Sequence, residues 1–385
     1  MKKVVSIVLN HFTNDSRVLK ENISLHKAGY RVAVVALYKE GLSEYESIDG
    51  IEVYRVKPLY YLENLRLVFV NLGLYLAAVK EFSKIVNDLS PDMVHCNDLN
   101  ALVIGVYIKK FLNHDIKIVY DSHEYQTEIV ITRSSPEYRR IYRLFERYCI
   151  KYADKVITVS NSIAEEYKRL YKIDKPCLIL NSPNIYSQIQ KKDILREKLG
   201  ISNKSKILIY QGILSKDRGN DIILDYFKMR SDLDIVVVFM GYTFDEELLE
   251  EVKSSSKKYK NIFYVEAVPV SQILDYTSSA DFGISMVKDT CLSHKFCLPN
   301  KFFEYAMAGL PVISSNNIEM MTLVEKYDMG VVVEDFSVGS LDIAINNLLA
   351  MDYNKISLNA RRCAEENSWE VQERKLIGLY NDISQ

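Results

Sequence analysis

The sequence lacks several features that would assign it to other classes of protein. Its 385 residues carry a formal net charge of −2, so no basic excess favours a nucleic-acid partner. The six cysteines are scattered, without a Cys-x-x-Cys pair or a zinc-like histidine spacing, which indicates a reducing compartment and no structural metal. The longest apolar run, residues 67–79, is broken by Asn71 and is too short for a membrane span. No Gly-x-Gly-x-x-Gly motif follows a predicted strand, which argues against a dehydrogenase.

Short β-branched runs alternate with amphipathic helical stretches along the chain. This alternation is typical of parallel sheets assembled from strand–helix units, and the length allows two domains of ordinary size. A polar, turn-rich passage between Asn181 and Lys204 separates two such series. We therefore predict an α/β protein with two Rossmann-like domains, over residues 1–185 and 186–367, and a final helix over 368–385.

The predicted elements follow from the apolar periodicity of each segment. Strands are expected at residues 4–9, 32–37, 93–95, 116–120, 155–159 and 178–180 in the first series, and at 207–210, 235–240, 263–265, 282–286 and 312–314 in the second. Helices are expected at residues 17–28, 67–89, 100–111, 138–152 and 162–171.

The most informative segment is 298–315, which combines a polar cluster, a helix and a buried strand. Pro299 suits the first helical position, and Asn300 and Lys301 follow at the positive end of the helix, where anions bind favourably. Glu304 lies one turn further along on a nearby face. A cation at a helix N-terminus can hold a diphosphate, and a carboxylate one turn away can accept hydrogen bonds from ribose hydroxyls. The alternative is a surface helix whose charges are merely solvated.

A second phosphate-binding candidate opens the second series. The strand 207–210 runs into Gly212, which permits a close backbone turn, and Arg218 and Gly219 follow where the next helix begins. Backbone N–H groups and a forked guanidinium aimed at one place form a reasonable cradle for phosphate. Junctions of this kind are common, so the pattern is weak by itself.

Polar residues also follow three strands of the first series. His123 and Glu124 come just after strand 116–120, and the alternative is a capping arrangement with Asp121 at the N-cap and Glu124 three residues later. Helix capping explains Asp15, whereas Arg17 is not needed for a cap. Asp98 follows strand 93–95 at the same predicted edge of the sheet.

Together these motifs resemble the retaining glycosyltransferases of family 4, in the branch that reads Pro-Asn-Lys-x-x-Glu-Tyr, and the resemblance extends along nearly the whole chain. It implies a GT-B fold, in which two Rossmann-like domains face each other across a cleft and the C-terminal helix crosses back to the first domain. It further implies that residues 1–185 bind the acceptor and that residues 186–367 bind a nucleotide sugar.

The resemblance also implies roles for individual residues. Arg218 and Lys301 would hold the donor diphosphate in place of a metal ion, so that no metal and no cofactor beyond the nucleotide sugar is expected. The donor-binding set is Gly212, Arg218, Gly219, Asn300, Lys301 and Glu304; the catalytic candidates are His123 and Glu304; the acceptor-side candidates are Asp15, Arg17, Asp98 and Glu124.

The sequence departs from the family pattern at two positions. Phe296 stands where the family often has the first of two glutamates, and Ile213 stands where an arginine often follows the first glycine of the phosphate loop. The departure at Phe296 leaves the identity of the donor sugar open. The Asp232-x-Asp234 pair resembles a metal-binding motif, but it precedes strand 235–240, at the end of the sheet opposite a ligand site.

The expected partners are a nucleotide sugar and a glycan or lipid-linked acceptor. Basic residues also recur through the predicted helix 138–152 with apolar residues between them, a pattern that fits an anionic membrane surface as well as it fits an ordinary solvated face. No export signal is recognisable at residues 1–9, so we expect a cytoplasmic protein that associates with the inner face of the membrane.

The resulting hypothesis is a retaining transferase that moves a hexose-type sugar to a cell-surface glycan. Two alternatives stay open. One is a nucleotide-sugar 2-epimerase with the same fold, and the other is a non-catalytic glycosyltransferase-like subunit. Nothing in the sequence identifies the donor base, the linkage or the oligomeric state.

Overall fold

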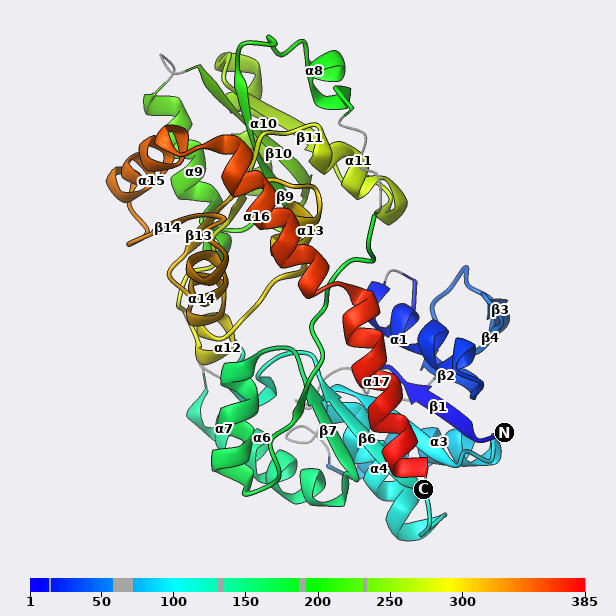
Figure 1. Cartoon of the computed structure of the whole chain (residues 1–385). Coiled ribbons are helices and arrows are strands. Elements are labelled where there is room, and N and C mark those ends of the chain that lie inside the picture. Colours follow the sequence, from blue (N-terminus) through cyan, green and yellow to red (C-terminus); the bar gives the residue numbers. More distant parts are fainter. Residues whose placement is uncertain (14, 58–71, 131–134, 187–191, 231–233, 385) are drawn as a thin grey trace. The chain divides into compact units, whose positions relative to one another are not determined.

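The computed structural model describes residues 1–13, 15–57, 72–130, 135–186, 192–230 and 234–384 (Figure 1). The chain folds into two compact units. Unit 1 comprises Met1–Ile179 and Gln372–Gln385, and unit 2 comprises Leu180–Val371. The C-terminal helix α17 (Trp369–Ser384) therefore begins in unit 2 and returns the chain to unit 1.

The described strands of unit 1 form one sheet in the order β3-β4-β2-β1-β5-β6-β7-β8. Neighbouring strands are parallel, except that β3 and β4 form an antiparallel hairpin. The central strands β1, β5 and β6 are buried on both faces, as parallel strands covered by helices are. The strands are β1 (Lys3–Ile7), β2 (Arg31–Leu37), β3 (Tyr45–Ile48), β4 (Ile51–Val56), β5 (Met93–Asn97), β6 (Lys117–Ser122), β7 (Lys155–Thr158) and β8 (Cys177–Leu178).

The helices of unit 1 begin and end where local chemistry predicts. Asp15 caps α1 by accepting the N–H of Val18 at 3.1 Å, and Gly29, at φ +95°, follows its last turn as expected from the sequence. Pro136 is the first residue of α6, after the capping Ser135. Besides α17, the helices are α1 (Ser16–Lys27), α3 (Leu72–Asp88), α4 (Asp98–Phe111), α6 (Pro136–Cys149) and α7 (Asn161–Tyr171), with 3-10 turns at Gln126–Glu128 and Ile150–Tyr152.

Unit 2 is a second parallel sheet with helices packed on it. Its described strands lie in the order β11-β10-β9-β12-β13-β14 and all pair in parallel. The strands are β9 (Lys206–Ile213), β10 (Ile235–Tyr242), β11 (Ile262–Glu266), β12 (Phe282–Ser285), β13 (Val312–Ser315) and β14 (Gly330–Val333). The helices are α8 (Ile194–Leu199), α9 (Asn220–Met229), α10 (Glu246–Lys258), α11 (Ile273–Ser278), α12 (Leu292–Lys295), α13 (Asn300–Met307), α14 (Ile318–Tyr327), α15 (Val338–Ala350) and α16 (Tyr353–Glu366), with 3-10 turns at Lys216–Arg218 and Val270–Gln272.

One close approach fixes α13 against the sheet of unit 2. A Cβ atom at Gly283 in β12 would lie 2.3 Å from the ring of Tyr305, so only glycine lets this buried ring lie against the strand. Tyr305 belongs to the Pro-Asn-Lys-x-x-Glu-Tyr motif. The packing of this ring therefore sets the depth and rotation of the helix that carries Lys301 and Glu304.

The prediction of two Rossmann-like α/β units is confirmed. The β3–β4 hairpin and β14 were missed, and helix α13 begins at Asn300, with Pro299 as its N-cap instead of its first residue. Residues 67–71 of the helix predicted at 67–89 lie outside the described residues, and the remainder forms α3. None of the helices in the described ranges combines the length and the apolar character that crossing a bilayer requires.

Candidate functional site

The phosphate-loop candidate of unit 2 lies at the carboxyl end of β9. Gly212, at φ +104°, ends the strand, and the 3-10 turn Lys216–Arg218 leads to Gly219 at φ +67°. Gly219 is buried, and a Cβ there would lie 3.1 Å from Met286. The side chain of Asn220 accepts the N–H of Ser215 at 2.7 Å and closes the turn. The predicted strand–glycine–helix junction is thus present, with Arg218 half-buried beside it.

Lys301 is the most unusual cation of unit 2. Its side chain is only 7% exposed, and its Nζ lies 3.6 Å from the centroid of the Tyr210 ring. Within the described part of the chain, this buried ammonium has no hydrogen-bond acceptor. Burial, and secondly the positive charge of Arg218, hold the pKa of Lys301 well below its usual range. A buried amine without an acceptor, close to a second cation, is a preformed place for an anion.

Glu304 lies one turn after Lys301, half-buried on α13. Its Oε2 accepts a hydrogen bond from the side-chain amide of Gln211, the residue before Gly212. The exposed Asn300 begins the same helix, and the half-buried Phe296 lies at the end of α12. The structure therefore brings Glu304, Lys301 and the end of β9 together, as the motif predicts.

The polar centre of unit 1 is built on Asp121, at the end of β6. Its fully buried carboxylate receives two hydrogen bonds from Arg17, Nε to Oδ2 at 3.0 Å and Nη2 to Oδ1 at 2.9 Å. Burial alone would raise the pKa of Asp121, but Arg17 and then His123 outweigh it and hold the pKa well below its usual range. The alternative reading of Asp121 as a helix cap is wrong, because its side chain forms this ion pair.

His123 lies between two carboxylates. Its Nε2 donates to Asp121 Oδ2 at 3.0 Å, and its Nδ1 is 3.8 Å from Asp98 Oδ2. Burial by itself lowers the pKa of His123, but Asp98 and Asp121 reverse this and raise the pKa to about 10, so the imidazolium persists at neutral pH. Asp98 adopts φ +67° at the start of α4, where its Oδ1 accepts the backbone N–H of His123 at 3.0 Å and the amide of Gln126 at 2.7 Å.

The acceptor-side candidates separate into two groups. Arg17 was predicted to be an acceptor-side residue. Its side chain is 3% exposed, because its guanidinium binds Asp121, Glu21 and the carbonyl oxygen of Ile179. It is a buried structural cation in this structure. Asp15 is half-buried as the cap of α1, and Glu124 is exposed just after His123.

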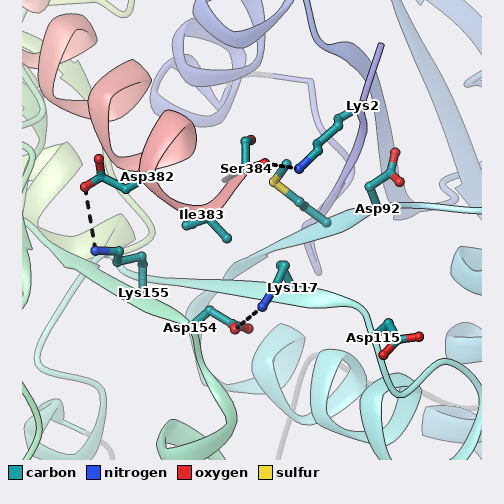
Figure 2. Close-up of a pocket in the computed structure, with 10 residues that line it drawn as sticks. Lys2, Asp92, Asp115, Lys117, Asp154, Lys155, Asp382, Ile383 and Ser384 are labelled. Carbon is teal, nitrogen blue, oxygen red and sulfur yellow. Dashed lines mark hydrogen bonds and ion pairs between the residues drawn. The ribbon is translucent and has the colours of Figure 1, made fainter.

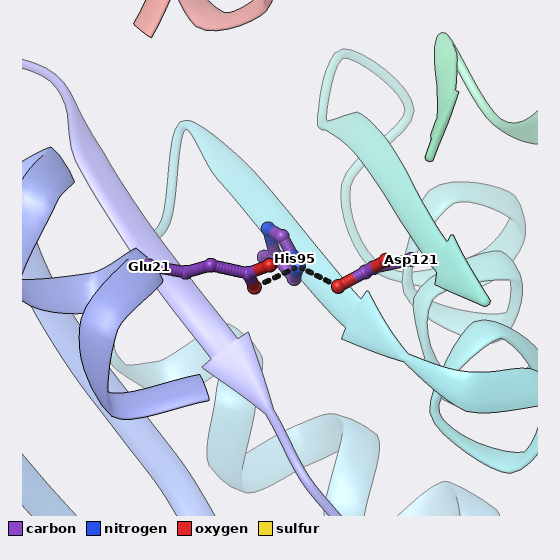
Figure 3. A group of neighbouring side chains, drawn as sticks. All are labelled: Glu21, His95 and Asp121. Atoms are coloured by element: carbon purple, nitrogen blue, oxygen red, sulfur yellow. Dashed lines mark ion pairs between the residues drawn. The ribbon is translucent and has the colours of Figure 1, made fainter. Parts of the chain in front are cut away.

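Glu21, His95 and Asp121 form the one group of potential metal ligands found within the described ranges (Figure 3). The Nε2 of His95 lies 3.3 Å from Glu21 and 3.5 Å from Asp121. Arg17 already pairs with both carboxylates, so their charge is compensated without a metal ion. We interpret the group as part of an ion-pair network, which continues from His95 Nδ1 to the hydroxyl of Tyr380 in α17 at 2.7 Å.

Comparison with known families agrees with the two-unit structure. Residues 23–182 match the model "Glycosyltransferase Family 4", and residues 191–367 match the model "Glycosyl transferases group 1", so that together the two models span most of the chain. The chain belongs to the glycosyltransferases with the GT-B fold.

Known relatives are distant. An uncharacterized glycosyltransferase of Methanocaldococcus jannaschii is 26% identical over 213 residues, which are 52% of the present chain and 51% of that protein. The chain thus matches about half the length of this curated relative. Among solved structures, sucrose-phosphate synthase from Thermosynechococcus elongatus aligns with a TM-score of 0.78 at 17% identity, covering 100% of this chain and 99% of that one. Anabaena Alr3699/HepE in complex with UDP-glucose aligns with a TM-score of 0.75 at 14% identity, covering 99% and 100%.

The basic helix of this glycosyltransferase, α6, is only partly available to a partner. Arg139 and Arg143 both pair with the buried Glu128, and Arg147 donates to the carbonyl oxygen of Leu170. On the buried face of α6, Glu146 accepts three tyrosine hydroxyls at 2.5–2.7 Å, from Tyr120, Tyr167 and Tyr171. Arg140, Leu144 and Lys151 remain on the exposed side.

A cavity of about 480 Å³ lies at the amino ends of the unit 1 strands, the end of the sheet opposite Asp121 (Figure 2). It is lined by charges of both signs, and its lysines pair locally, Lys117 with Asp154 at 3.4 Å and Lys155 with Asp382 at 3.8 Å. None of the residues predicted to act in the glycosyltransferase lines this cavity.

The Asp232-x-Asp234 pair belongs to unit 2. Asp234 precedes β10 as expected, whereas Asp232 lies outside the described residues.

Sequence reasoning missed Gln211 and Asp121 as site residues. Each lies at the carboxyl end of a strand, next to a motif residue that was recognised. Their partners Glu304 and Arg17 are 93 and 104 positions away in sequence. The signal available was a polar residue inside a buried strand end, which requires a buried partner.

Proposed function

We propose that the chain is a retaining glycosyltransferase that moves a hexose-type sugar from a nucleoside diphosphate sugar to a glycan or lipid-linked acceptor, in the synthesis of a cell-surface polysaccharide. Unit 2 binds the donor through Gly212, Arg218, Gly219, Asn300, Lys301 and Glu304. His123 acts at the donor sugar, and unit 1 binds the acceptor.

The observation that carries this proposal is a pair of neighbouring basic side chains, Lys301 and Arg218, without bound acceptors in the described part of the chain. Lys301 has no acceptor among the described residues, and Arg218 forms none of the ion pairs found there. A diphosphate supplies the missing acceptors, and its charge favours the protonated form of Lys301. The N-terminus of α13 adds partial positive charge to the same place. These groups stabilise the leaving nucleotide in the manner of a fixed cation, so the reaction is proposed to need no metal ion.

Two further observations support the assignment. Glu304, one turn from Lys301, offers the carboxylate that a ribose diol requires. The Anabaena protein of the same fold was solved with UDP-glucose, with UDP and glucose, and with UDP. We extend that ligand class to this chain as a proposal, and leave the base and the sugar to experiment.

The membrane is proposed as the place of the reaction, on the inner face. Arg140 and Leu144 lie one turn apart on α6, both exposed, Leu144 by 59%, and Lys151 is exposed in the 3-10 turn that follows. Basic and apolar side chains on one face fit the headgroups and the acyl boundary of an anionic bilayer. Because Arg139 and Arg143 are paired with Glu128, charge reversal at Arg140 and Lys151 is the cleaner test of sedimentation with anionic vesicles. Unchanged sedimentation of that variant would remove the membrane from the proposal.

The first experiment is thermal unfolding of the purified protein with UDP-, GDP-, dTDP- and ADP-sugars, without metal. A ligand that binds the native state raises the unfolding midpoint. We expect a rise with one nucleotide family, lost in Lys301→Met and in Glu304→Ala. Lys257→Met, at an exposed position of α10, is the matched control and should keep the rise.

The reaction itself then separates the alternatives. Transfer to an acceptor with unchanged anomeric configuration of the sugar supports the proposal. Conversion of the nucleotide sugar into its epimer without any acceptor identifies an epimerase. A protein that binds none of the nucleotides would be a non-catalytic subunit, and the proposed function would be abandoned.

A further inference from the structure

Gln211 connects three elements around the proposed donor site. It is 3% exposed at the end of β9, and both ends of its side-chain amide are engaged. The amide nitrogen donates to Glu304 Oε2 on α13, and the amide oxygen lies 2.6 Å from the hydroxyl of Thr277 on α11. Its backbone N–H donates to the hydroxyl of Tyr305 at 2.9 Å. The position of Gln211 is therefore fixed on three sides.

Counting protons decides the orientation of this chain of hydrogen bonds. Thr277 Oγ1 lies 2.6 Å from Gln211 Oε1 and 2.7 Å from the carbonyl oxygen of Ile273, but it has one proton to donate. An ionised Glu304 offers no donor, so the NH₂ group of Gln211 must face it. The amide oxygen then faces Thr277, and a stable contact requires the hydroxyl proton there. Thr277 thereby sets the direction of the Gln211 amide, and Gln211 keeps Glu304 an acceptor.

The consequence for Glu304 is a fixed carboxylate plane. A half-buried glutamate has three side-chain torsions to order, and holding one oxygen in place removes most of that freedom before a ligand arrives. A vicinal diol recognises a carboxylate through two hydroxyls at once, so the orientation of the plane decides whether both bonds form. The Thr277–Gln211–Glu304 chain links α11 to this carboxylate.

We propose that Gln211, itself oriented by Thr277, is a positioning residue that holds Glu304 to read the ribose diol, and so makes the site prefer ribonucleotides to 2′-deoxyribonucleotides. The inference rests on the proposed donor-binding function of unit 2. It assigns no contact between Gln211 and the nucleotide.

The test measures Kd for UDP and for 2′-deoxy-UDP by titration calorimetry, with the GDP or ADP pair used instead if the sugar panel selects that base. The ratio of the two Kd values is the readout. We expect the wild-type protein to favour the ribonucleotide by about tenfold or more, the worth of one hydrogen bond to a charged group. Glu304→Gln and Gln211→Met should bring the ratio close to one. Lys301→Met should weaken both nucleotides equally and leave the ratio unchanged.

Thr277 supplies a second, gentler variant in case Gln211→Met does not fold. Thr277→Val removes the hydroxyl at nearly constant volume and should lower the ratio, whereas Thr277→Ser keeps the hydroxyl and should preserve it. A merely structural role would lower the unfolding midpoint of the unliganded protein without moving the ratio.

Two results would overturn the inference, and they differ in what else they imply. If Glu304→Gln lowers the ratio while Gln211→Met and Thr277→Val keep the wild-type value, Gln211 does not position Glu304, and the donor site stands. If Glu304→Gln itself leaves the ratio unchanged, the carboxylate does not read the ribose, and that part of the proposed function fails as well.

Discussion

The two units place buried cations in opposite situations. In unit 1, Arg17 is surrounded by the carboxylates of Asp121 and Glu21, and each of its charged contacts is within 3.0 Å. In unit 2, the buried ammonium of Lys301 faces the ring of Tyr210 and has no acceptor among the described residues. In the first arrangement the guanidinium already has its counter-charges. The second gains stability only when an anion arrives, which is the property of a binding site.

The comparison shows that two basic motif residues of one chain can have different roles. Arg17 and Lys301 are each the second residue of a helix. Burial does not distinguish them, since both are more than nine-tenths buried. The difference is that Arg17 is bonded directly to carboxylates, whereas Lys301 has no hydrogen-bond acceptor among the described residues.

The largest effect on stability is expected from breaking the ion pair between Arg17 and Asp121. Asp121→Asn leaves the buried guanidinium of Arg17 without its main partner and should lower the stability of unit 1 by about 3–5 kcal/mol. Urea unfolding followed by hydrogen exchange in peptides from β6 measures this loss. Asp115→Asn, at an exposed position of the same unit, should stay within about 0.5 kcal/mol of the wild type. Equal stability of the two variants would show that Asp121 is not the main partner of Arg17.

The next effect concerns the cation without a partner. Lys301→Met removes a buried amine that has no hydrogen-bond acceptor among the described residues, so the unliganded protein should keep or gain stability. The affinity for a nucleoside diphosphate should fall by about 10- to 100-fold, the worth of hydrogen bonds to a charged group. Calorimetric titration with UDP, or with the diphosphate that the panel selects, gives the affinity. Thermal unfolding of the unliganded variant gives its stability. A clear loss of stability in the unliganded variant would contradict the comparison.

A smaller effect tests whether Arg218 acts by charge or by shape. Arg218→Lys keeps the charge beside Lys301 but replaces the planar fork by a point charge. We expect diphosphate affinity to fall by less than in Lys301→Met, by about three- to tenfold, because one of two parallel hydrogen bonds is lost. An affinity equal to that of the wild type would reduce the role of Arg218 to electrostatics.

A further test is a difference in pH dependence between the units. The pKa of His123 is raised from 6.5 to about 10 by Asp98 and Asp121 against the effect of burial, so its contribution is complete below pH 6.5 and is lost as the pH rises toward 10. Burial, reinforced by Arg218, lowers the pKa of Lys301, so the unfolded chain binds the extra proton and stability rises with pH up to about 10.5. Urea unfolding of the wild type, His123→Gln and Lys301→Met between pH 6 and 10 should show differences of opposite slope. Parallel curves would refute the assignment of the two charge states.

Local patterns in the sequence predicted the donor helix because its parts are neighbours in the chain. Lys301 and Glu304 belong to one short helix, so their relation follows from helical geometry, and the structure confirms the helix itself. The alternation of strands and helices likewise predicted both sheets. The β3–β4 hairpin was missed although Asp49-Gly50 is a strong turn signal, because the polar alternation of β3 does not resemble a buried parallel strand.

Contacts between segments that are far apart in the sequence could not be predicted from local patterns. The pairing of Arg17 with Asp121 depends on β6 and α1 lying near each other, and no local rule specifies this pair. Arg17 was therefore assigned to the acceptor side, and the structure shows it buried in an ion pair with Asp121. The role of Gln211 depends on the same kind of relation, because its partners come from α11 and α13.

The course of the chain has a consequence for the order of synthesis. The residues of unit 1 from Gln372 onward are translated only after the whole of unit 2, and they include Tyr380, the partner of His95. While unit 2 is being made, His95 in the polar centre of unit 1 lacks its contact with the hydroxyl of Tyr380. Unit 1 thus begins to emerge from the ribosome before unit 2 and is completed after it.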